Sequence, residues 1–360
     1  MPCCLVGSEM CIRDSKKSAL NRLRALFLLI RRLIVGVSLA HYLQQSVVPN
    51  ERGIALKKTI LSICNASKII AETLSENGLP DNQLGIHVGD INSDGDSQKA
   101  LDILADTAII NSFTNAGVAA YFSEEQDTAL LLERDGKLIV CVDPLDGSSN
   151  IDNNLSVGTI FSILPRKSEI FEPEYVLLDA LQPGKNQLAS GFFVYGPQTS
   201  LILTIGRGVA SFILKQGEFI QMEWEPSIPI AGNQFAINMS NMRYWSQPTE
   251  DYIQACLDGV DGRFAKDYNM RWCGSLVADA WRIFRQGGIF LYPEDSRENY
   301  HVGRLRLIYE ANPVAFLVEQ AGGRAIDGNG EILQIKPEGI HQRVPLIFGS
   351  RDDVFNYKSI

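Results

Sequence analysis

The chain has 360 residues, 45% of them hydrophobic and 21% charged, proportions typical of a folded globular protein and unlike those of disordered, collagen-like or coiled-coil chains. The net charge is −9, and residues 1–37 carry seven basic and two acidic side chains, which leaves 26 basic and 40 acidic residues, a net charge of −14, in the remainder. An acidic body argues against non-specific nucleic-acid binding and suits carboxylates that hold hard cations. Seven cysteines without a Cys-x-x-Cys pair predict neither a disulfide framework nor a zinc site, so we expect a reducing, cytoplasmic location.

The first 37 residues differ from the rest of the chain. They are basic and contain two short apolar runs that Arg31 and Arg32 separate, neither long enough to span a bilayer. Residues 4–15 also resemble translated sequencing-adapter sequence. We therefore expect 1–37 to be a non-native or disordered extension, with the native start between Val35 and Ser38; a targeting peptide is the alternative.

Hydrophobic periodicity predicts helices over residues 56–74 and 98–113, with a Gly- and Asp-rich mobile loop at 77–96 between them. Further helices are predicted at 275–286, with Ser275 as N-cap and Gly287 as the stop, and from Asn312 to Gly322. Runs of β-branched and aromatic residues predict strands at 129–132, 138–142, 159–164, 191–195, 199–204, 210–214, 289–292 and 305–309. The turn-rich segment 224–235 divides the chain into halves at 38–225 and 226–360. Helices and strands in blocks predict a layered α/β architecture.

The segment 137–152 has the highest density of functional residue types. An apolar strand leads into a turn where Pro144 and Gly147 let the carboxylates of Asp143 and Asp146 converge, with the Leu145 carbonyl between them. Two adjacent carboxylates repel each other unless a cation lies between them. The backbone N–H groups and hydroxyls of 147–150 then suit a phosphate.

Alternative interpretations exist for each of these acidic residues. The Asp-Pro-x-Asp-Gly pattern is also a good ordinary turn. Further acidic residues stand at element boundaries, and each of them alone is compatible with a solvated surface charge: Asp96, Asp102, Glu124 and Glu125. Glu310 precedes a helix, where a carboxylate can simply complement the helix dipole.

Five blocks, at 122–125, 143–152, 287–293, 305–313 and 340–345, resemble those of the class I fructose-1,6-bisphosphatases, within the metal-dependent, lithium-sensitive sugar and inositol phosphatases. The resemblance runs from about Ser38 to the C-terminus. The inositol monophosphatase branch would have Gly-Thr after the second Asp, where this chain has Gly147-Ser148-Ser149-Asn150, so that branch fits less well. The resemblance implies the αβαβα sugar-phosphatase fold, an α/β (α+β) class with two sheet-containing halves.

The resemblance also implies roles for particular residues. Two or three Mg²⁺ ions, with Mn²⁺ as a possible substitute, would be held by Asp96, Glu124, Glu125, Asp143, the Leu145 carbonyl, Asp146 and Glu310. Asp102 and Glu125 would position and deprotonate the attacking water, and Asp146 is the third expected catalytic residue. Oxygen ligands without His or Cys independently favour Mg²⁺ or Mn²⁺ over zinc.

Substrate contacts are expected in two groups. Gly147, Ser148 and Ser149 would orient the 1-phosphate, and the remainder of the sugar phosphate would contact Asn238, Arg271, Leu276, Tyr292, Arg304 and Arg306. Arg304 and Arg306 alternate on a predicted strand and should point the same way to clamp a phosphate, an exposed strand edge being the alternative. Arg271 resembles the arginine that reaches a neighbouring subunit's active site, which implies a homotetramer. Trp272 stands where a Tyr is common; its indole N–H can donate a hydrogen bond but not accept one.

The expected function is therefore Mg²⁺-dependent hydrolysis of fructose 1,6-bisphosphate to fructose 6-phosphate and phosphate, in gluconeogenesis or Calvin-type carbon metabolism, with no nucleic-acid or membrane partner. A sedoheptulose 1,7-bisphosphatase or dual enzyme is the closest alternative, and a non-catalytic sugar-phosphate-binding regulator is the alternative from another class. At the expected AMP site this chain has Gly53-Ile54-Ala55, Lys137 and Pro165, so only one lysine of the family pattern persists. We expect AMP inhibition to be weak or absent.

Overall fold

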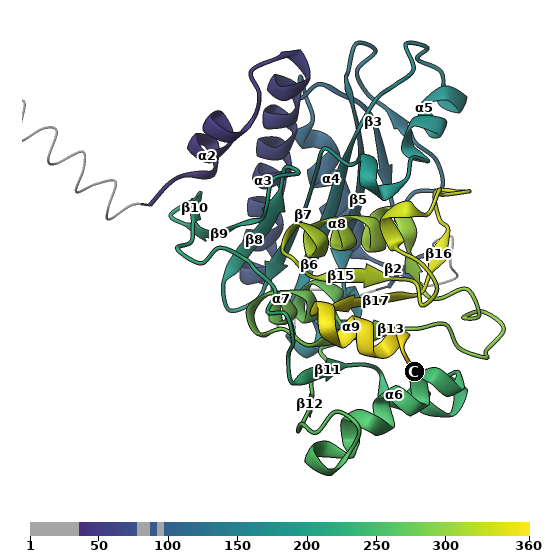
Figure 1. Ribbon diagram of the computed structural model, residues 1–360. Coiled ribbons are helices and arrows are strands. Elements are labelled where there is room, and N and C mark those ends of the chain that lie inside the picture. Colours follow the sequence, from purple (N-terminus) through teal and green to yellow (C-terminus); the bar gives the residue numbers. More distant parts are fainter. Residues whose placement is uncertain (1–35, 78–86, 92–96) are drawn as a thin grey trace, which may run out of the picture.

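The computed structural model of the protein describes residues 36–77, 87–91 and 97–360, in which helices and sheets alternate in five layers (Figure 1). Residues 1–35, with most of the expected extension, lie outside the described residues. An outer helical layer contains α2 (Leu39–Ser46), α3 (Glu51–Asn77) and α4 (Ala100–Ser112). These helices pack on one face of a large sheet through Leu43, Ile60, Ile63 and Ile109, all fully buried.

The large sheet has eight strands in the order β10-β9-β8-β7-β6-β5-β3-β4. Their bounds are β3 Val118–Ser123, β4 Leu130–Leu131, β5 Leu138–Asp146, β6 Val157–Pro165, β7 Ala189–Tyr195, β8 Thr199–Thr204, β9 Ala210–Lys215 and β10 Glu218–Gln221. Every residue of β5 is buried, because helices cover both faces of this strand. β3 and β5 run parallel, and every other neighbouring pair in this sheet is antiparallel.

The smaller sheet has five strands in the order β12-β11-β13-β17-β15. They are β11 Gln234–Ala236, β12 Asn269–Met270, β13 Ile289–Tyr292, β15 Arg324–Ile326 and β17 Leu346–Gly349. β12, β11 and β13 are mutually parallel neighbours, and β17 is antiparallel to both β13 and β15. On its outer face lie α6 (Gln247–Leu257) and α9 (Arg351–Lys358), packed through residues such as Tyr252 and Val354.

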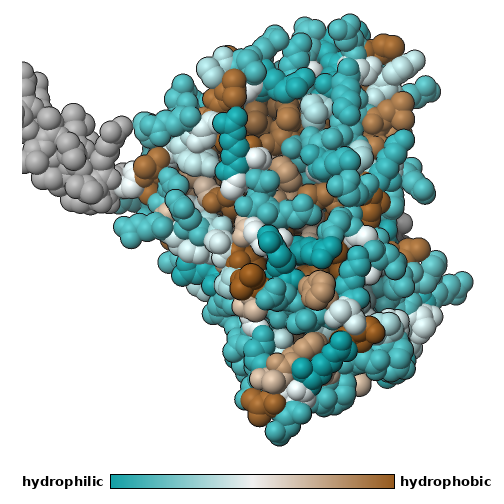
Figure 2. Space-filling view, in the orientation of Figure 1, coloured by the Kyte–Doolittle hydropathy of each residue, from teal (hydrophilic) through white to brown (hydrophobic). Residues whose placement is uncertain are grey.

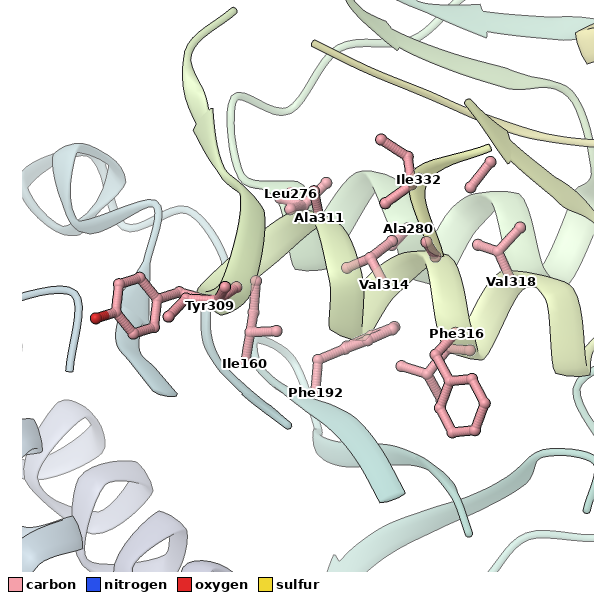
Figure 3. Packing of buried hydrophobic residues seen from close by; sticks show 14 of the residues in the cluster. Ile160, Phe192, Leu276, Ala280, Tyr309, Ala311, Val314, Phe316, Val318 and Ile332 are labelled. Carbon is pink, nitrogen blue, oxygen red and sulfur yellow. The ribbon is translucent and has the colours of Figure 1, made fainter. Parts of the chain in front are cut away.

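Two helices, α7 (Leu276–Gln286) and α8 (Asn312–Gln320), fill the space between the sheets. Figure 3 shows Val314 and Val318 of α8 and Ala280 of α7 among residues of the large sheet such as Ile160 and Phe192. Pro313 stands at the start of α8, where its missing N–H is not needed, and Gly287 ends α7 with a φ of 72°. The predicted αβαβα layering is confirmed.

Two local predictions were wrong, and one helix was not predicted. Residues 87–91, expected in a loop, form strand β1 (His87–Ile91), which pairs with β2 (Ser97–Lys99); residues 78–86 and 92–96 of the expected loop lie outside the described residues. The expected strand 305–309 is limited to β14 (Leu305–Arg306), paired with β16 (Arg343–Val344). Its remainder is a π-helical turn, Leu307–Ala311, since a short buried apolar run suits either structure. The helix that was not predicted is α5 (Pro173–Ala180), because its apolar residues follow no clear helical period.

Hydrophilic side chains cover most of the face drawn in Figure 2, and hydrophobic ones are scattered in small groups. In the part of the chain that the structure describes, no helix combines the length and the apolarity needed to cross a bilayer.

Candidate metal and phosphate site

Three carboxylates from distant parts of the sequence meet where the large sheet faces α7 and α8. Asp143 and Asp146 lie at the end of β5, and Glu310 lies in the π-helical turn that precedes α8. Each offers an oxygen, and these oxygens lie within 4.8 Å of one another. The three residues are only 4%, 7% and 7% exposed. Such a group of buried anions requires a compensating charge.

Local backbone geometry places the two aspartates. The Asp143 carboxylate accepts the Leu145 N–H at 3.0 Å, and the pairing of β5 with β6 becomes irregular between Asp143 and Asp146. The strand thus extends through Asp146, rather than ending at 142 as expected. Gly147 follows with a φ of 75°, and a Cβ there would lie 2.8 Å from the Ser275 Cβ, so this turn requires glycine on two counts.

Asp146 also binds the start of α7. Its carboxylate accepts hydrogen bonds from the Ser275 hydroxyl at 2.8 Å, the Leu276 N–H at 3.2 Å and the Val277 N–H at 2.9 Å. Ser275 stands at the N-cap as predicted, but its side chain binds Asp146 instead of capping its own helix. The Leu276 N–H, expected near the sugar, likewise faces Asp146. The helix N-terminus therefore stabilises the charged form of this carboxylate.

Glu124 joins the cluster together with an arginine. The Arg306 guanidinium is 3.8 Å from Glu124 Oε1, and the Arg306 main-chain N–H donates to Glu310 Oε2 at 2.6 Å. Arg306 is 2% exposed, whereas Arg304 is exposed, with its guanidinium 5.3 Å from the centre of the Tyr300 ring. Both arginines oppose the rise in the pKa of Glu310 that burial causes, so the two charges act on the same carboxylate from different depths. That they clamp a phosphate together stays a prediction.

Electrostatics in the cluster oppose full ionisation. Burial raises the pKa of Glu124 and of Asp143 well above their usual range, and neighbouring carboxylates, Glu310 beside Glu124 and Glu124 beside Asp143, raise them further. The pKa of Glu310 is raised to about 7, mainly by burial. A set of converging oxygens with mutually raised pKa values fits a hard divalent cation, which would relieve the repulsion.

The other expected ligands and bases stand as follows. Asp102 lies buried in the first turn of α4, and its charge, like that of Glu125, contributes to the raised pKa of Glu124. Both therefore face the same cluster. Leu145 is buried between the two aspartates. Asp96 lies outside the described residues.

The segment expected to hold a phosphate forms a 3₁₀ turn, Ser148–Asn153, directly after Gly147. Ser148 is half-buried and Ser149 is exposed, so both hydroxyls are at or near the surface. The Asn150 amide donates to the Cys273 carbonyl at 3.1 Å and ties this turn to the segment before α7.

Three expected substrate residues share one edge of the smaller sheet. Asn238 lies two residues after β11, Arg271 one residue after β12, and Tyr292 ends β13. Because these strands are parallel neighbours, their carboxyl ends lie at the same edge. Arg271 is exposed there, and the Asn238 side chain accepts the Ser240 N–H at 3.2 Å.

Aromatic rings line the same edge. Trp272 stacks on Phe290 with ring centres 5.7 Å apart and lies 5.7 Å from the Tyr292 ring. Burial raises the pKa of Tyr292, and the positive charge of the nearby Arg304 opposes that rise. Arg304 and Tyr292 are thus adjacent, as a phosphate clamp would require.

Sequence reasoning assigned no role to two residues that contact the site. Ser275 was interpreted only as a helix cap, although its hydroxyl binds Asp146. His341 lies within the block at 340–345, and its Nε2 is 3.1 Å from the Gln126 carbonyl, next to Glu125. The presence of one of only four histidines in a family block was the available signal.

Comparison with known proteins gives a consistent result. Residues 37–224 match the family model "Fructose-1-6-bisphosphatase, N-terminal domain", and residues 228–360 match "Fructose-1-6-bisphosphatase, C-terminal domain". The chain is 48% identical over 307 residues to the class 1 fructose-1,6-bisphosphatase of Azorhizobium caulinodans, covering 85% of this chain and 93% of that one. It is 53% identical over 273 residues to that of Sinorhizobium medicae, covering 75% and 77%.

A solved structure supports the same assignment. The holo form of Leishmania major fructose-1,6-bisphosphatase superposes with a TM-score of 0.83 at 34% identity, covering 90% of this chain and 98% of that one. With both family models matched and the fold shared, the chain belongs to the class 1 fructose-1,6-bisphosphatases, a family of phosphatases.

Proposed function

We propose that this protein hydrolyses the 1-phosphate of fructose 1,6-bisphosphate, releasing fructose 6-phosphate and inorganic phosphate, and that it requires Mg²⁺. The observation that carries the proposal is the convergence of Asp143, Asp146 and Glu310 within 4.8 Å at a buried site. The names of the relatives supply the substrate: each is called a fructose-1,6-bisphosphatase.

The residues that would hold the metal are Glu124, Asp143, the Leu145 carbonyl, Asp146 and Glu310, with Asp96 and Glu125 at a further position. Bound Mg²⁺ would neutralise charge on the phosphoryl oxygens and lower the pKa of water. Mn²⁺, which favours the same oxygen ligands, is an expected substitute.

The chain's own groups have distinct tasks in this proposal. Asp102 and Glu125 would accept the proton of the water that attacks phosphorus in line, as the bond to the sugar oxygen breaks. N–H groups after Gly147 and the Ser148 and Ser149 hydroxyls would orient the reacting phosphate. Arg304, Tyr292 and Asn238 would hold the other phosphate.

Arg306 is buried within the carboxylate cluster. Burial lowers its pKa, and the neighbouring Glu310 carboxylate opposes that effect. With its guanidinium 3.8 Å from Glu124, its first task is to offset carboxylate charge, and any contact with substrate would be made from within the cluster.

We also propose a homotetramer in which Arg271 reaches a neighbouring active site. The exposure of Arg271 at the edge that carries Asn238 and Tyr292 supports it. Sedimentation gives the assembly size. Mixed assemblies of Arg271→Ala and Asp143→Asn chains should regain part of the activity if the arginine acts across subunits, and no recovery would count against it.

Phosphate release from fructose 1,6-bisphosphate by the purified protein tests the main proposal, with Mg²⁺, with EDTA and after Mg²⁺ is restored. We expect release only with metal and near-complete loss in Glu310→Gln. Equal release in EDTA would overturn the proposal. The same assay with sedoheptulose 1,7-bisphosphate compares kcat/KM for the two sugars, and a protein that binds either without releasing phosphate would be the non-catalytic regulator.

A further inference from the structure

The turn that carries Glu124 and Glu125 is short and lies directly after β3. Its main chain is tied to the sheet at the first position, where the Glu124 N–H donates to the Val142 carbonyl at 3.0 Å. At the last position the Gln126 N–H donates to the Ser123 carbonyl at 3.3 Å. Within the turn, the Glu125 N–H donates to the Ser123 hydroxyl at 3.2 Å, and Glu124 lies 3.8 Å from the Arg306 guanidinium. The turn ends at Gln126, which is held from outside the turn through both its side chain and its carbonyl.

The Gln126 side chain is held from α4. Its amide Nε2 donates to Asp106 Oδ2 at 2.5 Å, and the other oxygen of Asp106 accepts the Tyr121 hydroxyl at 2.5 Å. Asp106 is 7% exposed and lies one helical turn after Asp102, on the same face of α4. Both oxygens of this buried carboxylate therefore have donors, and one of those donors belongs to the turn.

The Gln126 main chain is held from the other half of the protein. His341 Nε2 lies 3.1 Å from the Gln126 carbonyl, although the residues are 215 positions apart. A carbonyl only accepts, so Nε2 carries the proton. The His341 ring also packs 5.7 Å from the Tyr309 ring, and Tyr309 precedes Glu310. Figure 3 shows the Tyr309 hydroxyl directed away from the labelled residues of α8.

We propose that Gln126 is a positioning residue for the metal site: Asp106 holds its side chain, His341 holds its carbonyl, and together they fix the turn that presents Glu124 and Glu125. The inference rests on the proposed metal-dependent function and extends it to three residues outside the set proposed to hold metal or substrate. Groups that orient metal ligands from behind commonly change metal affinity by about 10- to 100-fold when altered.

An exchange of the two side chains tests the inference. In Gln126→Glu, two carboxylates face each other across the 2.5 Å contact and repel, so the turn must shift. In the double variant Asp106→Asn with Gln126→Glu, the introduced amide donates to the introduced carboxylate, and its oxygen still accepts the Tyr121 hydroxyl. Size and net charge then equal those of the unaltered protein.

The readout is direct Mn²⁺ binding to the purified protein by calorimetry, alongside the melting temperature. We expect Gln126→Glu to weaken Mn²⁺ binding about tenfold, and the double variant to return within about twofold of the unaltered affinity. An added negative charge alone would strengthen cation binding, whereas a displaced turn would weaken it. The direction of the change in Mn²⁺ affinity therefore distinguishes the two effects. Asp106→Asn alone is the matched control. It should bind Mn²⁺ as the unaltered protein does, because the Gln126 amide can flip so that its oxygen accepts a hydrogen bond from the introduced amide.

Mn²⁺ affinity unchanged or increased in Gln126→Glu would overturn the inference, as would a double variant that binds as weakly as the single one. Should Gln126→Glu fail to fold, His341→Phe, which keeps a ring beside Tyr309, is measured in the same way and should also weaken binding. No Mn²⁺ binding by the unaltered protein would overturn the proposed function itself. Binding by the unaltered protein with no effect of these variants would overturn the positioning role alone.

Discussion

The Asp146 carboxylate accepts a hydrogen bond from the Val277 N–H at 2.9 Å, although 131 positions separate the two residues. The bond joins the end of β5, in the first half of the chain, to the first turn of α7, in the second half. The same carboxylate belongs to the proposed metal site, so in that proposal one side chain would hold a cation as well as anchor a helix.

Two substitutions of Asp146 separate these tasks. Asp146→Asn and Asp146→Ala should both reduce the rate of phosphate release by about 100- to 1,000-fold, the scale expected when a charge-stabilising group is lost. The Leu276 and Val277 N–H groups bind different oxygens of Asp146; asparagine keeps one of these acceptors, whereas alanine removes both. We therefore expect the alanine variant to be less stable than the asparagine variant by about 1–2 kcal/mol. Urea unfolding of both metal-free variants measures this difference, and equal stabilities would argue against the anchoring role.

Glu310 predicts an unusual pH dependence of stability without metal. Its pKa is raised from 4.5 to about 7, so between these values the folded protein binds more protons than the unfolded chain. Stability in EDTA should therefore fall as pH rises from about 5 to about 7.5. Thermal melts across this range should show the decline, and Glu310→Gln should make it shallower, with Glu124 and Asp143 accounting for the remainder. Mg²⁺ should raise the melting temperature more at pH 7.5 than at pH 5.5, because binding displaces the proton. A slope unchanged in the glutamine variant would contradict the assignment to Glu310.

Arg304 and Arg306 should respond differently to truncation. Arg304 is exposed beside Tyr292, so Arg304→Ala should raise KM about tenfold through loss of a charged hydrogen bond to phosphate, with little change in melting temperature. Arg306 is buried beside Glu124, so Arg306→Ala should destabilise the protein by about 1–3 kcal/mol. Steady-state kinetics and thermal melts on both variants check the contrast. Equal loss of stability in the two variants would contradict it.

AMP should inhibit this protein weakly or not at all. Gly53 leaves no room for a side chain, since a Cβ would lie 1.9 Å from the Val48 carbonyl oxygen, and Pro165 offers no charge. Lys137 lies 4.0 Å from the exposed Glu51, which competes for its ammonium group. An AMP titration of phosphate release at saturating Mg²⁺ gives the answer, and micromolar inhibition would refute the prediction.

Local pattern was sufficient for the elements whose burial is continuous or regular. The helix predicted at 56–74 lies within α3, and the strand predicted at 138–142 lies within β5, because apolar residues at a helical period or in an unbroken run report which faces are buried. The motif of residues 143–152 and the family blocks were sufficient to indicate a phosphatase, because the carboxylates for a metal and the turn for a phosphate follow one another directly in the chain.

Only the tertiary structure decided what joins distant segments. The meeting of Glu310 with Asp143 and Asp146, the anchoring of α7 by Asp146 and the burial of Arg306 all depend on contacts across more than a hundred residues, which no local period encodes. The turn at Leu307–Ala311 is a further example, because its apolar residues suit a buried strand and a buried helix equally. Tertiary packing around residues 307–311 stabilises the helical turn, and this turn places Glu310 beside Asp143 and Asp146.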